Sequence, residues 1–358
     1  MECCGQLFRL TGRNLIMEYL DWFEAVKKNW DRIAKPLDSL GELENVVCRI
    51  GAIQETDRPH VKNAVAVILC ADNGIVEEGV SQCGKEVTRI CAENIAAKKS
   101  AVGSLARLTG TEIKVFDIGI EYQKKITGVS DRKISMGTKN FLKEDALSNR
   151  QLDEAIKTGI EIAGEMKAAG YDAICIGEMG IGNTTTSAAV TAGILKLGAA
   201  DVTGRGAGLD DRGLERKIKV VSRAIDRYDL HNLNPVEILQ KVGGLDIAAM
   251  TGVYLGAKKF HIPVILDGAI SLAALLVADY MDSDVRKYVI ASHKGRETLG
   301  QKILEKMDLH PVIDASLALG EGTGAVLMMN LIRSSLDVYY ECVPFSDSGV
   351  EQYERFNK

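Results

Sequence analysis

The chain has 358 residues, enough for one large domain and a smaller one, and its 46% apolar and 26% charged residues are typical of a soluble globular protein. Lysine and arginine total 44 against 49 aspartate and glutamate residues, a net charge of −5. This balance argues against nucleic acid or an anionic membrane surface as a partner, so local amides and a few basic side chains would have to hold a small anionic substrate.

The eight cysteines show neither the spacing of a redox pair nor zinc-ligand spacing from a histidine, which favours a reducing compartment and no metal site. The N-terminus lacks the apolar run of a signal peptide. The longest mostly apolar stretch, residues 269–278, is too short to span a bilayer. We therefore expect a cytoplasmic protein.

Residues 1–60 are predicted to be helical, because apolar side chains recur there at helical spacing until Pro36 and Gly41 interrupt the pattern. The repeating apolar residues are Trp22, Phe23, Val26, Trp30 and Ile33. This segment is expected to pack on the body of the protein or on a second subunit, as a small domain that also takes in part of the C-terminus.

The first strong strand is the apolar run at 64–69, of the type buried in parallel sheets, and it ends in the turn Asp72-Asn73-Gly74. A helix is predicted over about 86–98 and a strand over 112–118. Residues 121–150 are polar and irregular. We interpret them as an excursion from the sheet, either a solvated loop or a lid that faces a phosphate.

After a helix over 152–166, a strand at 173–176 runs into Gly177-Glu-Met-Gly-Ile-Gly-Asn-Thr-Thr-Thr-Ser187 and then an alanine-rich helix over 188–197. Strand, glycine loop and helix in this order aim backbone N–H groups at an anion. Glu178 would repel that anion, so it suggests a second task such as holding a proton. An ordinary strand-to-helix turn is the alternative, although a turn needs fewer hydroxyl and amide side chains.

A second glycine pattern, Gly204, Gly206 and Gly208, leads into a helix that an aspartate at 210 or 211 would cap. The dinucleotide-binding spacing is absent, so the pattern alone is a weak signal. Together with Lys217 it becomes a candidate phosphate loop, with a plain linker as the alternative.

The remaining chain continues the alternation of strands and helices. Predicted strands at 263–266 and 288–291 end in Asp267 and Ser292, and each is followed by a helix. Leu319-Gly-Glu-Gly-Thr-Gly324 precedes an apolar helix over 325–331. This alternation predicts an α/β fold with a doubly wound, mostly parallel Rossmann-like sheet over residues 61–332, a smaller helical domain from the chain ends, and a strap over 333–358.

Four polar residues directly follow predicted strands, namely Asp72, Glu178, Asp267 and Ser292. Because ligands of open α/β sheets bind at the carboxyl ends of the strands, one pocket could collect all four. The sequence has no nucleophile-elbow pattern, and its five histidines are scattered; His293 lies in a promising turn but is interpreted as structural or capping.

Glu178 and Glu321, each in a glycine loop, are therefore the candidate acid–base groups. A carboxylate held in an apolar glycine loop has a raised pKa and can act as a general base near neutrality. The alternative for Glu321 is a charge that complements a helix dipole.

Six motifs of the chain resemble those of the nicotinate-nucleotide:dimethylbenzimidazole phosphoribosyltransferase family. They occur in the same order as in the family, over roughly residues 20–340. They are Gly177-Glu-Met-Gly-Ile-Gly-Asn-Thr-Thr185, Gly204-Arg-Gly-Ala-Gly-Leu-Asp-Asp211, Gly243-Gly-Leu-Asp246, Leu266-Asp-Gly268, Ser292-His293 and Leu319-Gly-Glu-Gly-Thr-Gly324. The resemblance implies transfer of the 5-phosphoribosyl group of nicotinate mononucleotide to 5,6-dimethylbenzimidazole, giving α-ribazole 5′-phosphate and nicotinate in cobamide biosynthesis. It also implies two small-molecule substrates, no cofactor and a homodimer, to which the N-terminal helix could supply a contact.

The resemblance assigns roles residue by residue. It makes Glu321 the general base that takes the azole proton and Glu178 a second carboxylate of the site. The residues expected to bind the nucleotide and its phosphate are Gly180, Gly182, Asn183, Thr184, Gly204, Gly206, Gly208, Lys217, Asp267 and Ser292. Those expected to line the acceptor-base site are Asp72, Ser81, Lys85, Met179 and Leu319.

The sequence departs from the family pattern near the expected acceptor site. Asp72-Asn73-Gly74 replaces the usual Asp-His-Gly, and Ser81 lacks the aromatic-proline pair that usually follows the serine. Transfer to a purine or a phenol therefore stays open. So do a nucleotide-binding sensor of the same fold, which an intact Glu321 disfavours, and an unrelated sugar-phosphate enzyme such as a sugar isomerase.

Overall fold

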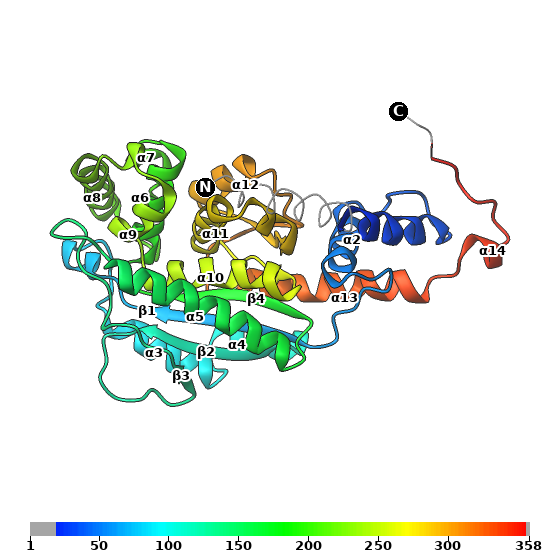
Figure 1. Cartoon of the computed structure of the whole chain (residues 1–358), viewed down its shortest axis with the longest axis horizontal. Coiled ribbons are helices and arrows are strands. Elements are labelled where there is room, and N and C mark those ends of the chain that lie inside the picture. Colours follow the sequence, from blue (N-terminus) through cyan, green and yellow to red (C-terminus); the bar gives the residue numbers. More distant parts are fainter. Residues whose placement is uncertain (1–18, 356–358) are drawn as a thin grey trace, which may run out of the picture.

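The computed structural model describes residues 19–355 and is organised around one six-stranded parallel sheet (Figure 1). The strand order is β3-β2-β1-β4-β5-β6. The strands are β1 Ala64–Ala71, β2 Glu112–Gly119, β3 Val129–Asp131, β4 Ala173–Met179, β5 Val264–Ile265 and β6 Val289–Ile290. The predicted α/β fold with a doubly wound parallel sheet is confirmed.

β1 lies at the centre of this sheet and is buried along its whole length. Val65 pairs with Glu112 of β2 on one side and with Ile174 of β4 on the other. Its alternate residues enter two different apolar clusters: Val65 and Val67 face one layer of helices, whereas Ala66 and Ile68 face the other. A run of small and β-branched residues suits a strand that is covered on both faces.

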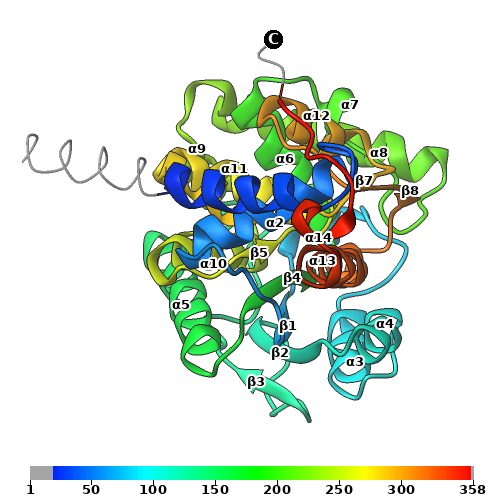
Figure 2. The same ribbon diagram turned by 90° about the vertical axis from the view of Figure 1, so that its right-hand side faces the viewer.

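Helices cover both faces of the sheet (Figure 2). On one side α5 (Asn149–Ala168) packs against α10 (Leu245–Phe260), and on the other lie α3 (Glu86–Ala96), α4 (Ala101–Thr109) and α13 (Thr323–Glu341). Glycines allow α5 and α10 to touch: a Cβ at Gly159 would lie 1.9 Å from the carbonyl oxygen of Ala249. A larger residue there would push the two helices apart.

A further group of helices lies around α6 and α11 (Figure 1). The α-helices of this group are α6 Asn183–Leu195, α7 Ala199–Val202, α8 Asp211–Tyr228, α9 Pro235–Val242, α11 Ala269–Met281 and α12 Thr298–Lys306. Short 3₁₀ helices occur at Gly74–Glu78, Leu230–Asn232 and Ser283–Tyr288. Within residues 19–355, every helix is too short or too polar to cross a membrane.

The two ends of the described chain meet beside α13. A helix over residues 19–32 and α2 (Glu42–Gln54) pack on its C-terminal part, with the rings of Trp30 and Tyr339 5.0 Å apart. Ile33 forms an antiparallel bridge with Pro344, just before α14 (Phe345–Ser348). Trp30 shares its apolar cluster with β1, so the predicted division into a small and a large domain stays a prediction.

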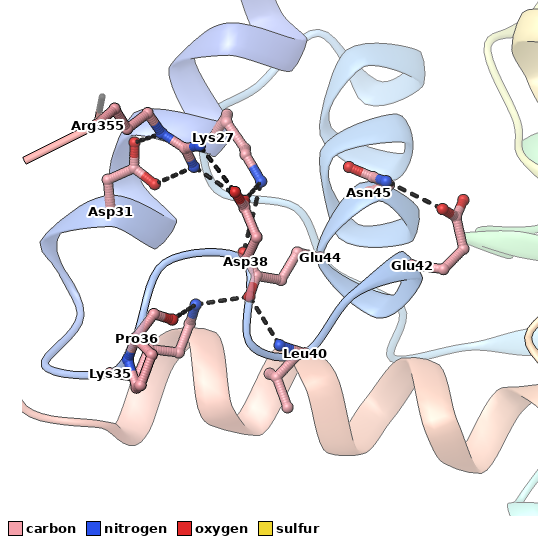
Figure 3. Close-up of polar contacts among 10 residues, drawn as sticks. All are labelled: Lys27, Asp31, Lys35, Pro36, Asp38, Leu40, Glu42, Glu44, Asn45 and Arg355. Carbon is pink, nitrogen blue, oxygen red and sulfur yellow. Dashed lines mark hydrogen bonds and ion pairs between the residues drawn. The ribbon is translucent and has the colours of Figure 1, made fainter. Parts of the chain in front are cut away.

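Ion pairs and hydrogen bonds connect the two chain ends at this junction (Figure 3). The guanidinium of Arg355 binds the carboxylates of Asp31 and Asp38, with contacts of 2.6 to 2.9 Å. Glu44 is completely buried, and its carboxylate accepts hydrogen bonds from the Lys35 ammonium at 2.6 Å and the Leu40 N–H at 3.0 Å. Arg355 thus pairs with the helix over residues 19–32 and with the turn that follows it.

Residues 121–148 are irregular as expected, except that Val129–Asp131 pair with β2 as strand β3. Three other local expectations were wrong. α6 begins at Asn183 rather than Ala188, because Thr186 bonds back to the Asn183 carbonyl at 2.8 Å and is satisfied inside the helix. The expected turn after Ser292 is β7 (His293–Gly295), which pairs in parallel with β8 (Ile313–Leu317) in a separate small sheet. α13 is longer at both ends than the predicted 325–331.

Candidate active site

A cavity of about 330 Å³ opens where the loops after β4, β5 and β8 converge with two other segments. Its walls come mainly from residues 80–83, 178–184, 205–207, 209, 267–272 and 317–321. Loops that follow the carboxyl ends of parallel strands are the usual place for a ligand in such a sheet. The cavity is therefore the candidate active site.

Most of the residues predicted for the site lie on the wall of this cavity. Those are Ser81, Glu178, Met179, Gly180, Gly182, Asn183, Thr184, Gly206, Asp267, Leu319 and Glu321. The others, which do not line it, are Asp72, Lys85, Gly204, Gly208, Lys217 and Ser292. Lys217 and Ser292 each contact a residue of the wall, Thr184 and His293 respectively.

Glu321 lies in a turn of three consecutive left-handed residues. The φ angles are +83° at Gly320, +59° at Glu321 and +79° at Gly322. A left-handed conformation at a non-glycine residue is uncommon and, where it persists, is held by its surroundings. Gly177 of β4 is one reason the turn fits: a Cβ there would lie 2.8 Å from the Gly322 nitrogen.

The carboxylate of Glu321 is placed as a proton acceptor would be. Its Oε2 atom is buried and makes no hydrogen bond in the structure, although the side chain borders the cavity. Burial, and secondarily the negative charge of Asp267, raise the pKa of Glu321 above its ordinary value. The group can therefore exchange a proton closer to neutrality than an exposed glutamate does.

Asp267 follows β5 and binds the N-terminus of α13. Its two carboxylate oxygens accept hydrogen bonds from the N–H groups of Gly322 at 3.1 Å and Gly324 at 2.8 Å. Gly322 is the N-cap residue of α13 and has no side chain to do this itself. A carboxylate from another strand thus takes the place of the missing cap.

Glu178 ends up in the interior, beside a second buried acid. The side-chain amide of Asn183 donates to Glu178 and also, at 3.2 Å, to Asp246. Burial raises the pKa of Glu178 well above its usual value, and the charges of Asp246 and Asp267 act in the same direction. Burial also raises the pKa of Asp246 to about 6. These conditions disfavour the charged form of Glu178.

The two candidate phosphate loops converge at the N-terminus of α6. The N-cap residue Gly182, with φ of +92°, supplies no side-chain cap. Lys217 of α8 is fully buried, and its Nζ atom donates a 2.7 Å hydrogen bond to Thr184 Oγ1. Gly206 closes over both, since a Cβ there would lie 2.8 Å from that hydroxyl and 3.3 Å from Nζ.

Lys217 lacks a carboxylate partner in a salt bridge within the described part of the chain. Burial lowers the pKa of its ammonium to about 8, and the charge of Glu297 opposes this shift. A buried cation beside an uncapped helix N-terminus is a setting in which an anion is stabilised. The N-termini of α6 and α13 differ in this respect, because the Asp267 carboxylate already accepts hydrogen bonds from N–H groups at the start of α13.

Apolar side chains line another part of the cavity. They include Val80, Val87, Met179 and Leu319, with the thiol of Cys91 among them. Leu319 is 56% exposed, although it is a large apolar residue. An apolar wall next to Glu321 can accept an aromatic ring that carries a removable proton.

Asp72 and Lys85 are displaced from this wall for a physical reason. Asp72 is buried and accepts the Glu121 N–H at 2.8 Å, and Lys85 forms a 2.9 Å ion pair with the same Glu121. Both point toward the loop after β2, and Lys85 lines a separate polar cavity there. Their expected contact with an acceptor base stays a prediction.

Sequence reasoning gave no site role to Asp246 or His293. Asp246 was recognised only as the start of a helix, and its contact with Asn183 of the cavity wall depends on the sheet order. His293 lines the cavity, and its Nδ1 lies 2.9 Å from Ser292 Oγ. Gln82 and Arg205 also line it, within the two segments that were expected to bind the acceptor and the nucleotide. Gly243 and Gly244, which precede Asp246, were the sequence signal that could have pointed to it. A Cβ at Gly244 would lie 2.2 Å from the Asp246 carboxylate, so only glycine leaves room for that side chain.

Metal ligation has no support in this region. Among residues 19–355, histidine, cysteine, aspartate and glutamate side chains form no group of three that could hold a metal ion. The six described cysteines are free thiols. The cavity offers an unpaired carboxylate, a helix N-terminus and an apolar wall, with a buried ammonium one hydrogen bond behind Thr184.

Comparison with known proteins gives a consistent result. Residues 19–350 match the family described as "Phosphoribosyltransferase". The chain is 40% identical over 335 residues to the nicotinate-nucleotide–dimethylbenzimidazole phosphoribosyltransferase of Ruminiclostridium cellulolyticum, covering 94% of this chain and 95% of that protein. It is 41% identical over 321 residues to the protein of the same name from Geobacter sp., covering 89% and 92%. The crystal structure of CobT from Thermus thermophilus superposes with a TM-score of 0.87 at 35% identity, covering 93% of this chain and all of that one.

Proposed function

The chain belongs to the nicotinate-nucleotide–dimethylbenzimidazole phosphoribosyltransferase family, and on that premise we propose that it is a pentosyltransferase acting on nicotinate mononucleotide and 5,6-dimethylbenzimidazole. The products are α-ribazole 5′-phosphate and nicotinate, in cobamide biosynthesis. The observation that carries this proposal is the buried, unpaired carboxylate oxygen of Glu321. It borders the same cavity as the N-terminus of α6, which has no side-chain cap.

The donor phosphate is assigned to the N-terminus of α6. The helix dipole is positive there, no side chain caps the helix, and the Lys217 ammonium lies one hydrogen bond behind Thr184. The N-terminus of α13 is a poor alternative, because Asp267 already binds its N–H groups and would repel a phosphate. Burial favours the neutral form of Glu178, which reduces the repulsion that its position beside the glycine loop suggested.

The chemical step requires no group beyond those of the cavity. The bond between the ribose C1′ atom and the pyridinium nitrogen breaks, and its electron pair leaves with nicotinate. A ring nitrogen of the acceptor forms the new bond to C1′, and the proton of the other ring nitrogen passes to the Glu321 carboxylate. The cationic pyridinium is already a good leaving group, so positioning and proton removal are what the protein must supply.

The acceptor is assigned to the apolar wall beside Glu321. Dimethylbenzimidazole is flat and apolar apart from its two nitrogens, which matches side chains such as Val87, Met179 and Leu319. Ser81 adds a hydroxyl on the same wall. A purine carries more polar edges, for which this wall has few partners.

The state of the protein in the cell is also a proposal. The six free cysteines of the described chain fit a reducing compartment, for which we propose the cytoplasm. We propose a homodimer by analogy with the family. Sedimentation velocity on the purified protein measures that state directly.

The decisive assay is base-dependent release of nicotinate. The protein is incubated with nicotinate mononucleotide alone and with dimethylbenzimidazole, adenine or phenol, and nicotinate and the ribosylated product are quantified by chromatography. Equal amounts of nicotinate and α-ribazole 5′-phosphate, formed fastest with dimethylbenzimidazole, are expected. Donor binding without turnover would identify a sensor instead, and release that does not depend on an acceptor would identify a hydrolase.

A further inference from the structure

Asp267 lines the cavity, yet its carboxylate is already engaged by the protein. Both oxygens accept N–H groups of the segment that carries Glu321, those of Gly322 and Gly324. From this geometry we infer that Asp267 is a positioning residue for Glu321 and not a ligand of the nucleotide. The inference rests on the proposed function only in naming Glu321 as the base.

The turn needs an external support. Its three residues are all left-handed, and for Glu321 this conformation is unfavourable by itself. The N–H groups at the start of α13 would be unsatisfied without an acceptor, since the N-cap is glycine. Asp267 satisfies two of them and thereby fixes the peptide that follows Glu321.

Asp267 is itself held firmly. It is 4% exposed, and its own N–H donates to Ser271 Oγ at 3.1 Å. Ser271 in turn donates to the Gly268 carbonyl at 2.8 Å, which closes a small ring of hydrogen bonds at the end of β5. The preceding residue, Leu266, is bonded to the Ile290 carbonyl beside it. A continuous series of hydrogen bonds therefore connects the parallel sheet, through Asp267, to the turn that carries Glu321.

Asp267 also acts on Glu321 by charge. A negative charge nearby disfavours a second one, so Asp267 adds to burial in raising the pKa of Glu321. The other titratable groups around this turn are Glu178 of β4, Cys91 of α3 and His293 of β7. Burial favours the neutral form of each of these three, which leaves Asp267 as the main fixed charge facing the base.

The substitution Asp267→Asn separates a positioning role from a ligand role. Asparagine keeps the size but has one acceptor oxygen, and its NH₂ group would face a backbone N–H. The expected result is a fall in kcat of about tenfold or more, with the KM for nicotinate mononucleotide within about twofold of the parent. Loss of the charge should also move the acidic limb of the kcat profile to lower pH.

A second measurement does not depend on turnover. Hydrogen–deuterium exchange followed by mass spectrometry should show faster exchange of peptides spanning residues 318–326 in Asp267→Asn than in the parent. Asp246→Asn is the matched control, because Asp246 is an equally buried carboxylate that bonds to the α6 side of the cavity. It should leave exchange in 318–326 unchanged.

Opposite results would overturn the inference. If Asp267→Asn weakened donor binding by tenfold or more while the pH profile and the exchange of 318–326 stayed as in the parent, Asp267 would be a nucleotide ligand. If Asp267→Asn did not fold, Ser271→Ala, which loosens Asp267 but keeps its charge, should still accelerate exchange in 318–326, and unchanged exchange would contradict positioning. A parent protein that transfers to no acceptor would refute the proposed function, while the exchange data would still decide the role of Asp267.

Discussion

The ammonium of Lys217 and the hydroxyl of Thr184 are joined by a 2.7 Å hydrogen bond. This contact connects the two glycine-rich segments, each of which is a phosphate-loop candidate by its sequence. Lys217 reaches Thr184 through a fully buried side chain, so its charge cannot be screened by solvent from the N-terminus of α6. The two segments therefore form one anion-binding corner.

Replacing Lys217 by alanine should weaken donor binding far more than acceptor binding. A charge-assisted hydrogen bond is worth roughly 1.5 to 3 kcal/mol, which corresponds to about a tenfold to hundredfold loss of affinity for nicotinate mononucleotide. Calorimetric titration with each substrate measures this directly. Lys219→Ala on the exposed side of α8 is the matched control, and it should bind like the parent. Equal donor affinity in Lys217→Ala and the parent would remove Lys217 from the site.

The buried ammonium also makes a prediction about stability and pH. Burial lowers the pKa of Lys217 from 10.5 to about 8, so between these values the unfolded chain binds more protons than the folded one. The contribution of this group to the free energy of unfolding should therefore rise between pH 8 and about 10.5, by roughly 3 kcal/mol in total. The difference in unfolding free energy between the parent and Lys217→Met, measured by denaturant unfolding at each pH, isolates the contribution of Lys217. A stability difference that stays constant over this pH range would show that the ammonium is not desolvated.

Glu321→Gln should lower turnover by about a hundredfold or more while donor affinity stays nearly unchanged. Glutamine keeps the size and adopts the same left-handed turn at similar cost, but it cannot take the azole proton. Glu178→Gln should lower turnover far less than Glu321→Gln does. A neutral glutamine resembles the uncharged acid that burial favours, and its side-chain oxygen can still accept the hydrogen bond from Asn183. Single-turnover rates from pH 6 to 9 decide between them. If Glu321→Gln kept the parent rate, Glu178 would become the first candidate for the base.

The sequence predicted most of the residues that line this site, but it did not predict the contacts between residues far apart in the chain that hold them in place. The apolar runs that precede Glu178 and Asp267 indicate strands, and both glycine loops have distinctive compositions. The capping of α13 by Asp267, by contrast, links residues brought together only when β5 lies beside β4 in the sheet. Asp246 was overlooked for the same reason, since its partner Asn183 belongs to another helix. β7 and β8 were missed because their residues are largely polar or exposed, without the alternation that marks a strand.

Acceptor choice should respond to the segment that follows Ser81. Cys83 lines the cavity, whereas Gly84 lies just outside it, so a phenylalanine-proline pair at these positions would add a ring to the wall and stiffen its backbone. We expect the relative rates with dimethylbenzimidazole, adenine and phenol to change by about tenfold for at least one acceptor. Alanine at both positions is the control, because it adds no ring. An unchanged ranking would mean that other residues set the selectivity.

The junction of the chain ends should depend on Glu44 more than on Arg355. Glu44 is completely buried between Lys35 and Lys27, so Glu44→Ala leaves two partly buried ammonium groups without their partner and should destabilise the protein by about 3 kcal/mol. Arg355 forms more contacts, but on the surface, where an ion pair contributes about 1 kcal/mol or less. Thermal unfolding of both variants ranks them. A larger loss in Arg355→Ala would contradict this order.

The central place of β1 has a consequence for biosynthesis on the ribosome. β1 can pair with β2 soon after both have left the exit tunnel, but its other edge must wait for β4, which is synthesised much later. Until then an apolar strand keeps one row of N–H and C=O groups open, the kind of edge that pairs with other nascent chains. The newly made protein therefore passes through an aggregation-sensitive interval, and chaperone binding during translation should be strongest between the emergence of β2 and that of β4.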